Sequence, residues 1–237
     1  MNPFACLSKN ARNIDLRFAS VVACLACWTI TPPVHAGEYD EAVWDWRAGD
    51  LIFRSGIDPF DDLIATYAGA QFGSAAIVRA SSGGPRVVYV DPDIGVTEIM
   101  LDEFVAGLDE SDYAAYRIRE AGDWGQSDSP ISYNALLVAY GKPADRYRFP
   151  GGDAYYSAEL VFLAALGAGV QLGQPIRLSE LSQDRPDLRH AFLRDWQENP
   201  YCQYIATEQA CWELIRDTAV LTTQAIMNDP DLERLHP

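Results

Sequence analysis

The chain has 237 residues, a formal net charge of −16 and a pI of about 4.4. Its length suits one domain with room for a small addition. So acidic a surface repels phosphate backbones, which argues against nucleic-acid binding, and it is not attracted to anionic lipid headgroups.

The first 36 residues have the pattern of a secretory signal peptide. Three basic residues precede the apolar run FASVVACLACWTI, and VHA precedes Gly37. A basic start, a short apolar core and a small-residue cleavage site are typical of such signals, and the run is too short to span a bilayer. We therefore expect residues 1–36 to be a leader and residues 37–237 to be an exported domain, periplasmic or secreted. Cys24 and Cys27 leave a lipoprotein anchor as a weaker alternative, and a disordered or membrane-associated leader is another.

Removal of this leader, which holds three basic residues and one acid, leaves 15 basic and 33 acidic residues. Lys142 is then the only lysine, and Cys202 and Cys211 are the only cysteines. An even pair in an oxidising compartment fits a disulfide. Two buried thiols that behave as small apolar side chains fit equally well.

The first half of the domain reads mainly as strands separated by turns. Gly and Pro clusters such as SSGGP and DPDIG separate β-rich runs, which favours a meander. Strands are predicted at 49–54, 72–80, 86–90, 96–99 and 113–119, and helices at 59–69 and 101–108.

The second half reads mainly as helices. Ser129 and Pro130 are typical of a helix start and Gly141 of a helix end. Helices are predicted at 129–141, 156–169, 186–197 and 206–217, followed by a polar tail. Strands that cluster early, with helices flanking and following them, indicate an α+β domain and not an alternating parallel one.

Neither a metal nor a cofactor is expected. The exported part holds only His190 and His236, and no His or Cys pair has zinc spacing. The turns DPFDD, DPDIG and NDPDLE lack the oxygen pattern of a calcium loop, and no phosphate-binding glycine loop is present.

Ser157, in the stretch YYSAELV, precedes an apolar helix and invites three interpretations: a nucleophile, a helix cap, or the remnant of a catalyst. The GxSxG elbow of serine hydrolases is absent. His190, the histidine within the domain body, lies in a predicted amphipathic helix, where a surface role is favoured over that of a base. Ser157 with Glu159 in the first turn is typical of an N-cap.

The order of motifs resembles the circularly permuted, papain-like NlpC-type cysteine hydrolases, in particular the YiiX/YaeF-like group. Members carry a GDLIF-like strand, a helix with an Ala-Thr pair, and an aromatic-Ser-His strand with the catalytic histidine. A strand with an acidic partner, a GKPYD-like turn and a helix opened by YCSELV then follow. The matching segments here are GDLIF at 49–53, AT at 65–66, GKPAD at 141–145, YSAELV at 156–161 and LGQP at 172–175.

The departures from this pattern fall on the catalytic positions. Ser157 stands where the family has its cysteine, followed by Ala158 in place of a serine. Ser74 stands where it has its histidine, preceded by Gly73 in place of a serine, and the acidic partner matches loosely at Asp91. The helix dipole and a nearby imidazolium increase the thiolate fraction of a cysteine at a helix N-terminus. A serine hydroxyl has no comparable ionised fraction at neutral pH. General acid–base help alone is worth about 10²–10⁴ in rate. The resemblance therefore implies a permuted papain-like fold that has lost catalysis, by nature or by engineering.

Under this interpretation the former cleft, around Ser74, Asp91 and Ser157, binds an acyl, amide or peptide ligand of the cell envelope without turning it over. Tyr155 and Tyr156 are candidate cleft residues, with core packing as an equal alternative.

Two other hypotheses stay open. One is an active hydrolase of amide or ester bonds that uses Ser157 with a base from elsewhere, such as His190 or Asp91. The other is a purely structural or partner-binding role for the acidic surface.

Overall fold

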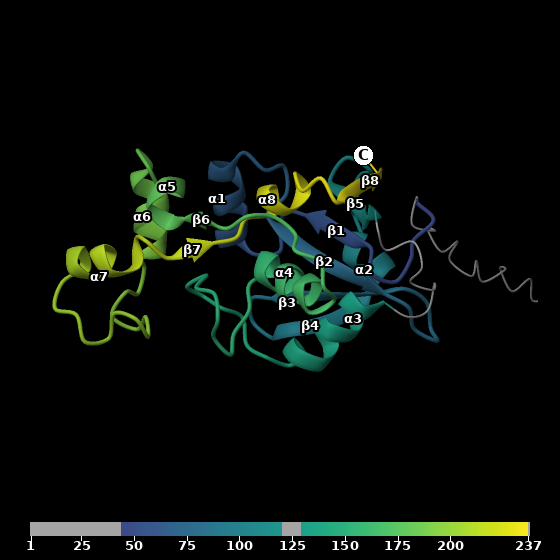
Figure 1. The fold of residues 1–237 in the computed structure, drawn as a ribbon, viewed down its shortest axis with the longest axis horizontal. Coiled ribbons are helices and arrows are strands. Elements are labelled where there is room, and N and C mark those ends of the chain that lie inside the picture. The colour runs from purple at the N-terminus through teal and green to yellow at the C-terminus, as the bar shows by residue number, and fades with distance from the viewer. Residues whose placement is uncertain (1–43, 120–128, 237) are drawn as a thin grey trace, which may run out of the picture. The chain divides into compact units, whose positions relative to one another are not determined.

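The structure is a computed structural model that describes residues 44–119 and 129–236, all within one compact unit. The predicted leader, 1–36, lies outside the described residues. None of the helices in the described part is long and apolar enough to cross a membrane. The elements in chain order (Figure 1) are β1 (Leu51–Arg54), α1 (Pro59–Ala68), β2 (Ser74–Arg79), β3 (Arg86–Asp91), β4 (Gly95–Met100), α2 (Leu101–Val105), β5 (Tyr113–Ile118), α3 (Pro130–Asn134), the π-helical turn η2 (Ala135–Ala139), α4 (Ser157–Gly167), β6 (Ile176–Arg177), α5 (Leu178–Leu181), α6 (Pro186–Phe192), α7 (Glu208–Ile215), β7 (Ala219–Val220), α8 (Thr223–Met227) and β8 (Leu232–His236).

Six strands form one antiparallel sheet in the order β4-β3-β2-β1-β5-β8. Strands β1 to β4 form the predicted meander, and the central strand β1 sets Ile52 between Ala76 of β2 and Ala115 of β5. The predicted α+β class with an antiparallel sheet packed against helices is confirmed.

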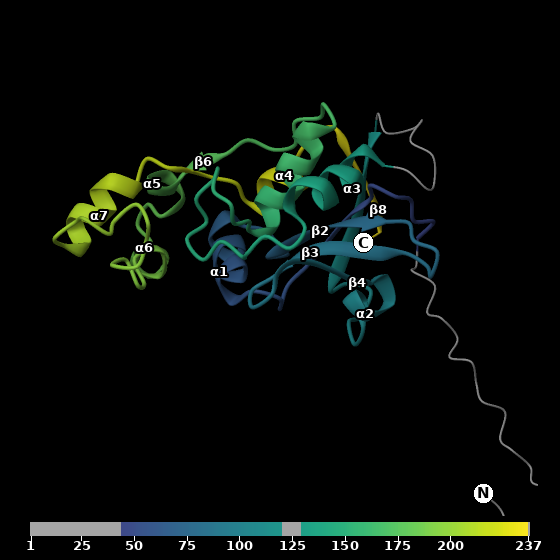
Figure 2. The same ribbon diagram turned by 90° about the horizontal axis from the view of Figure 1, so that it is seen from below.

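The two faces of the sheet bury different cores, because side chains alternate along each strand. Leu51 and Phe53 face the larger core, which α3, α4 and α8 cover, and Ile52 faces the smaller core beneath α2. Figure 2 shows α3 and α4 on one side of the strands and α2 on the other. Seven of the eleven residues of α4 are buried, as expected for a helix that is apolar on nearly every face.

A third core joins α1 to the helices that follow β6. The ring of Phe60 lies 4.9 Å from that of Phe192, edge to face, so that α6 packs against α1. Cys202 and Cys211 are fully buried in this core and joined by a disulfide. The structure therefore has the disulfide and not the two free buried thiols.

Three expectations from the sequence pattern are corrected. The helix predicted at 129–141 consists of α3 and the π-helical turn η2, and the helix predicted at 186–197 ends at Phe192. The polar tail, for which the sequence pattern predicts no strand, forms the edge strand β8 on β5, where His236 stacks on Tyr113 at 4.8 Å.

Candidate functional site

Ser157 is the first residue of α4, and its hydroxyl donates a 2.8 Å hydrogen bond to Oδ2 of Asp61 in α1. The N-cap residue is Tyr156, whose backbone is extended. The prediction that Ser157 caps the helix is therefore wrong. An N-cap oxygen accepts from the backbone of the first turn, whereas this hydroxyl is used as a donor to a carboxylate on another helix.

Arg148 ties Asp61 to its surroundings. Its Nε donates to Oδ1 of Asp61 at 2.8 Å, its Nη2 to Asp58, and its Nη1 to the carbonyl of Asp145. The guanidinium also lies 4.9 Å from the centre of the Phe60 ring. The side chains of Arg148 and Asp61 are only 4% and 7% exposed. We call Ser157, Asp61, Arg148 and Asp58 the buried network.

Burial and charge oppose each other in this network. Desolvation raises the pKa of Asp61 above its usual range, although the coulombic attraction of Arg148 works against the rise. Desolvation disfavours the charged form of Arg148, but attraction to Asp61 and Asp58 outweighs it and raises the pKa of the guanidinium. Asp61 is thus the group placed to accept a proton from Ser157. Ser157 is only 2% exposed, so its hydroxyl is closed off from solvent.

Ser74 begins β2, and its partner across the β1–β2 ladder is Arg54. Partners in a ladder present their side chains on the same face. Arg54 reaches the carbonyl of Phe104 in α2, so Ser74 belongs to the α2 face of the sheet. Its Oγ is buried without a hydrogen-bond partner, and Ser157 bonds to Asp61 instead.

The residue before Ser74 shows what fills the space on the opposite face. A Cβ on Gly73 would lie 2.1 Å from Oδ1 of Asp62 and 2.7 Å from its backbone. The first turn of α1 therefore occupies the room that a serine at this position would need.

Asp91 ends β3 and closes the β3–β4 turn by accepting 2.9 Å hydrogen bonds from the backbone of Asp93 and of Ile94. Continuation of the β2–β3 register, in which Ile77 pairs with Val88, would set Asp91 opposite Ser74. Two of the predicted site residues thus share one end of the sheet, while the third belongs to the buried network.

The other candidates lie elsewhere. Tyr155 and Tyr156 are 8% and 3% exposed and pack in the larger core. The hydroxyl of Tyr156 accepts from the backbone of Leu221 at 3.0 Å, and burial raises its pKa. His190 is exposed on α6.

The loop at residues 145–153, of which the motifs singled out only Asp145, carries Arg148 and is fixed by two carboxylates. Asp145 accepts from the backbone of Tyr147 at 2.8 Å and of Phe149 at 2.7 Å. Glu159, in the first turn of α4, accepts from Gly151 at 3.1 Å. Glu159 is 3% exposed with Oε2 unpartnered, and burial raises its pKa to about 7.

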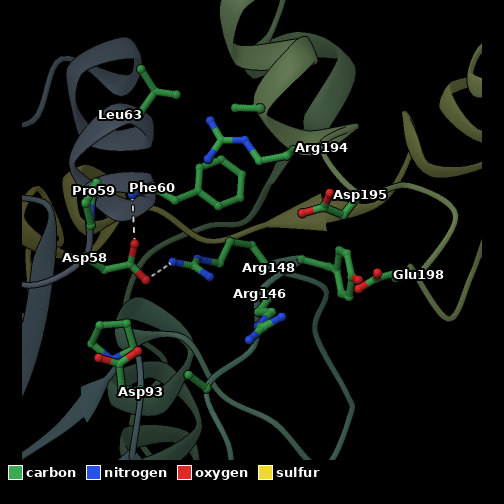
Figure 3. Close-up of a pocket in the computed structure, with 14 residues that line it drawn as sticks. Asp58, Pro59, Phe60, Leu63, Asp93, Arg146, Arg148, Arg194, Asp195 and Glu198 are labelled. Carbon is green, nitrogen blue, oxygen red and sulfur yellow. Dashed lines mark hydrogen bonds and ion pairs between the residues drawn. The ribbon is translucent and has the colours of Figure 1, made fainter.

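A cavity of about 360 Å³ borders the buried network (Figure 3). Asp58 and Arg148 belong to both, whereas Ser157 does not line the cavity. The lining comes from α1 and the residue before it, the β3–β4 turn, Ala144 and the loop that follows it, and the last residues of α6 with the segment after it: Asp58, Pro59, Phe60, Leu63, Pro92, Asp93, Ala144, Arg146, Tyr147, Arg148, Ala191, Arg194, Asp195 and Glu198. The one hint of this in the sequence is the run RYRF, two arginines alternating with aromatics in a predicted loop.

No family model and no curated protein matches the chain. Among solved structures, the crystal structure of metalloprotein YiiX from Escherichia coli O157:H7, DUF1105, matches with a TM-score of 0.59. The identity is 17%, and the match covers 81% of this chain and 97% of that one.

The description of that neighbour as a metalloprotein prompts a test of the residues here. No group of three or more His, Cys, Asp or Glu side chains within the described ranges could hold a metal ion. The neighbouring carboxylates of Asp58 and Asp61 share the guanidinium of Arg148 and so are already paired with a cation. The described residues therefore do not fit a metal centre. What this chain shares with YiiX is the fold: a mixed α+β arrangement with a six-stranded antiparallel sheet packed against helices.

Proposed function

We propose that this protein is an exported, non-catalytic binding protein of permuted papain-like architecture. Its ligand is an acyl, amide or peptide compound of the cell envelope, held in the cavity beside the former nucleophile position. The observation that carries the proposal is the hydrogen bond from Ser157 to Asp61 within the buried network.

This bond supports a structural role for Ser157. A nucleophile must reach the carbonyl carbon that it attacks, and Ser157 is 2% exposed. Its proton acceptor, Asp61, is also held by Arg148, whose attraction opposes the rise that burial gives to the pKa of this carboxyl group. Ser74, at the histidine position, offers no base and lies on the α2 face.

The cavity supports the binding half of the proposal. Its volume of about 360 Å³ lies in the usual range of small-molecule pockets, about 300–1,000 Å³. Phe60 and Leu63 give it an apolar wall, and Asp58 and Arg148 connect it to the network. The leader-like pattern of residues 1–36 and the Cys202–Cys211 disulfide support export.

The test is hydrolysis by the purified protein and by Ser157→Ala, with acyl esters, thioesters, acyl amides and cell-wall peptides as substrates. We expect neither protein to turn over any of them, and the same panel to contain compounds that raise the thermal midpoint of both. Turnover by the wild type that disappears in Ser157→Ala would show that the proposal is wrong.

The same hydrogen bond gives an active hydrolase one specific point in its favour. Asp61 lies 2.8 Å from the Ser157 hydroxyl and would replace His190 or Asp91 as the base. In that case Asp61→Asn would lose turnover together with Ser157→Ala, while His190→Ala would keep it. Substrate access would require α1 or the 145–153 loop to move away from Ser157.

A further inference from the structure

The outer surface of α3, η2 and α4 is apolar. Figure 1 and Figure 2 both show α3 beside α4, and Nδ2 of Asn134 in α3 donates a 3.2 Å hydrogen bond to the carbonyl of Ala164 in α4. Their inward side chains pack in the larger core. Six large apolar residues on or directly after these elements are more than a third exposed, and we call them the apolar face: Tyr133 (63%), Leu137 (67%), Val138 (57%), Tyr140 (51%), Leu163 (37%) and Leu166 (47%).

The same surface carries no exposed charged side chain. Residues 129–141 and 154–176 contain one charged residue, Glu159, although 22% of the chain is charged. Glu159 is 3% exposed, so its carboxylate does not reach the surface. A helix that packs on one side and faces water on the other normally carries polar and charged residues on its outer side, and a helix that is apolar on all sides is normally buried. The outer sides of α3 and α4 thus have the composition of a covered surface.

The area of the apolar face reaches the limit of what monomers expose. A fully exposed large apolar side chain presents roughly 150–250 Å², so the six residues at their observed exposures present on the order of 600 Å². The largest apolar patch on a typical monomer is about 300–600 Å², and a stable interface buries about 800 Å² on each partner. Exposed uncharged neighbours supply the remaining area: Pro130, Gly141 and Gly167.

The charge pattern favours a second copy of this chain as the partner. Two molecules with a formal net charge of −16 repel each other wherever their acidic surfaces meet. A two-fold arrangement brings the same surface of each copy together, and this neutral surface is one through which two copies can meet without facing charges. A basic partner would be attracted to the acidic surface instead, and an anionic bilayer would repel the whole protein.

We propose that the protein forms a two-fold symmetric homodimer through the apolar face, with α3 and α4 of one copy packed against α3 and α4 of the other. The inference does not depend on the binding function proposed above, because none of the six residues lines the cavity or belongs to the buried network.

Sedimentation equilibrium of the purified protein tests the proposal. We expect a reversible monomer–dimer equilibrium with a dissociation constant in the micromolar range or below. Leu137→Glu and Leu166→Glu each place a charge in the interface, and two-fold symmetry places it there twice. Each should weaken the dimer by at least about thirtyfold, the factor that corresponds to a hot-spot residue.

Leu214→Glu is the matched control. Leu214 is 54% exposed on α7 and lies outside the apolar face, so this variant adds the same charge to a comparable leucine and should dimerise as the wild type does. Higher salt should strengthen the wild-type dimer or leave it unchanged, because salt screens the repulsion between two acidic molecules. A dimer that weakens with salt would depend on ion pairs, and the proposal would be wrong.

Three other outcomes would also overturn it. The first is a wild-type protein that stays monomeric throughout the micromolar range. The second is a dimer that Leu137→Glu and Leu166→Glu leave intact, since another surface would then form the interface. The third is a monomer that co-sediments with phosphatidylcholine vesicles and loses this binding in both variants, which would assign the apolar face to a lipid surface.

Discussion

Replacement of Arg148 by methionine should destabilise the protein strongly. The side chain is 4% exposed and makes ion pairs with Asp58 and Asp61. Methionine keeps much of the apolar contact with Phe60 but leaves Asp61 buried without its cation. Removal of one partner from a buried pair costs about 3–5 kcal/mol, a large part of the roughly 5–15 kcal/mol that holds a domain folded.

The destabilisation caused by Arg148→Met should depend on pH, because protonation of Asp61 removes its buried negative charge. Burial already raises the pKa of Asp61, and the attraction of Arg148 opposes the rise. Without Arg148 the folded pKa moves further above the unfolded one. A carboxyl group with a raised folded pKa destabilises the fold above that pKa, and the penalty disappears below the unfolded pKa. The variant should therefore recover part of its free energy of unfolding when the pH is lowered from neutral toward the unfolded pKa of a carboxyl group, about 4.

Urea denaturation at neutral pH and at this lower pH, with the disulfide intact, measures these effects. The double variant Asp61→Asn/Arg148→Met should regain about 1–2 kcal/mol over Arg148→Met, because the more deeply buried carboxylate is neutral and only Asp58, which is 18% exposed, is left without its cation. Arg216→Met is the matched control, since its ion pair with Glu213 is about half exposed and should be worth at most about 1 kcal/mol. If Arg148→Met costs no more than this control, or costs the same at both pH values, the account of the buried network is refuted.

Three further perturbations follow from the structure. The pKa of Glu159 is raised from 4.5 to about 7, so the free energy of unfolding should fall as pH rises through that interval, by on the order of 2–3 kcal/mol. Glu159→Gln should flatten this part of a stability–pH profile, and an unchanged profile would contradict the assignment. Gly73→Ser should cost more than about 2 kcal/mol in urea denaturation, because its Cβ would meet the Asp62 backbone at 2.7 Å; Gly83→Ala, with open space around it, should change stability by less than about 0.5 kcal/mol. Reduction of the disulfide, which closes a loop of nine residues' separation, should cost about 2–3 kcal/mol; a thermal midpoint unmoved by reductant would refute this.

The sheet was largely predictable because its strands carry local signals. GDLIF and RVVYV are β-rich runs between turn residues, and both are strands. The edge strand β8 was missed because LERLH has only two apolar residues separated by charges. Its pairing with β5 also joins segments more than 100 residues apart, which periodicity does not report.

The site was predicted only in part, for a related reason. Motif order drew attention to Ser157, but a serine with Glu159 two residues later looks the same whether it caps the helix or begins it. The contact with Asp61 depends on how α1 and α4 meet, and no pattern along either helix specifies that. The predicted roles of Ser74, Asp91, Tyr155 and Tyr156, and the signal peptide, stay predictions.

The buried network also has a consequence for folding rates. Its hydrogen bonds join residues 87 to 96 positions apart, whereas the β1–β4 meander pairs neighbouring strands. Contacts that close long loops carry a larger entropy cost and tend to form after local ones. We therefore expect Arg148→Met to speed unfolding and to leave the refolding rate almost unchanged, as for interactions absent from the transition state. The contacts of the buried network that link α1 to α4 would then form late in folding. They would lower the unfolding rate, and so lengthen the lifetime of the folded protein, while contributing little to the folding rate.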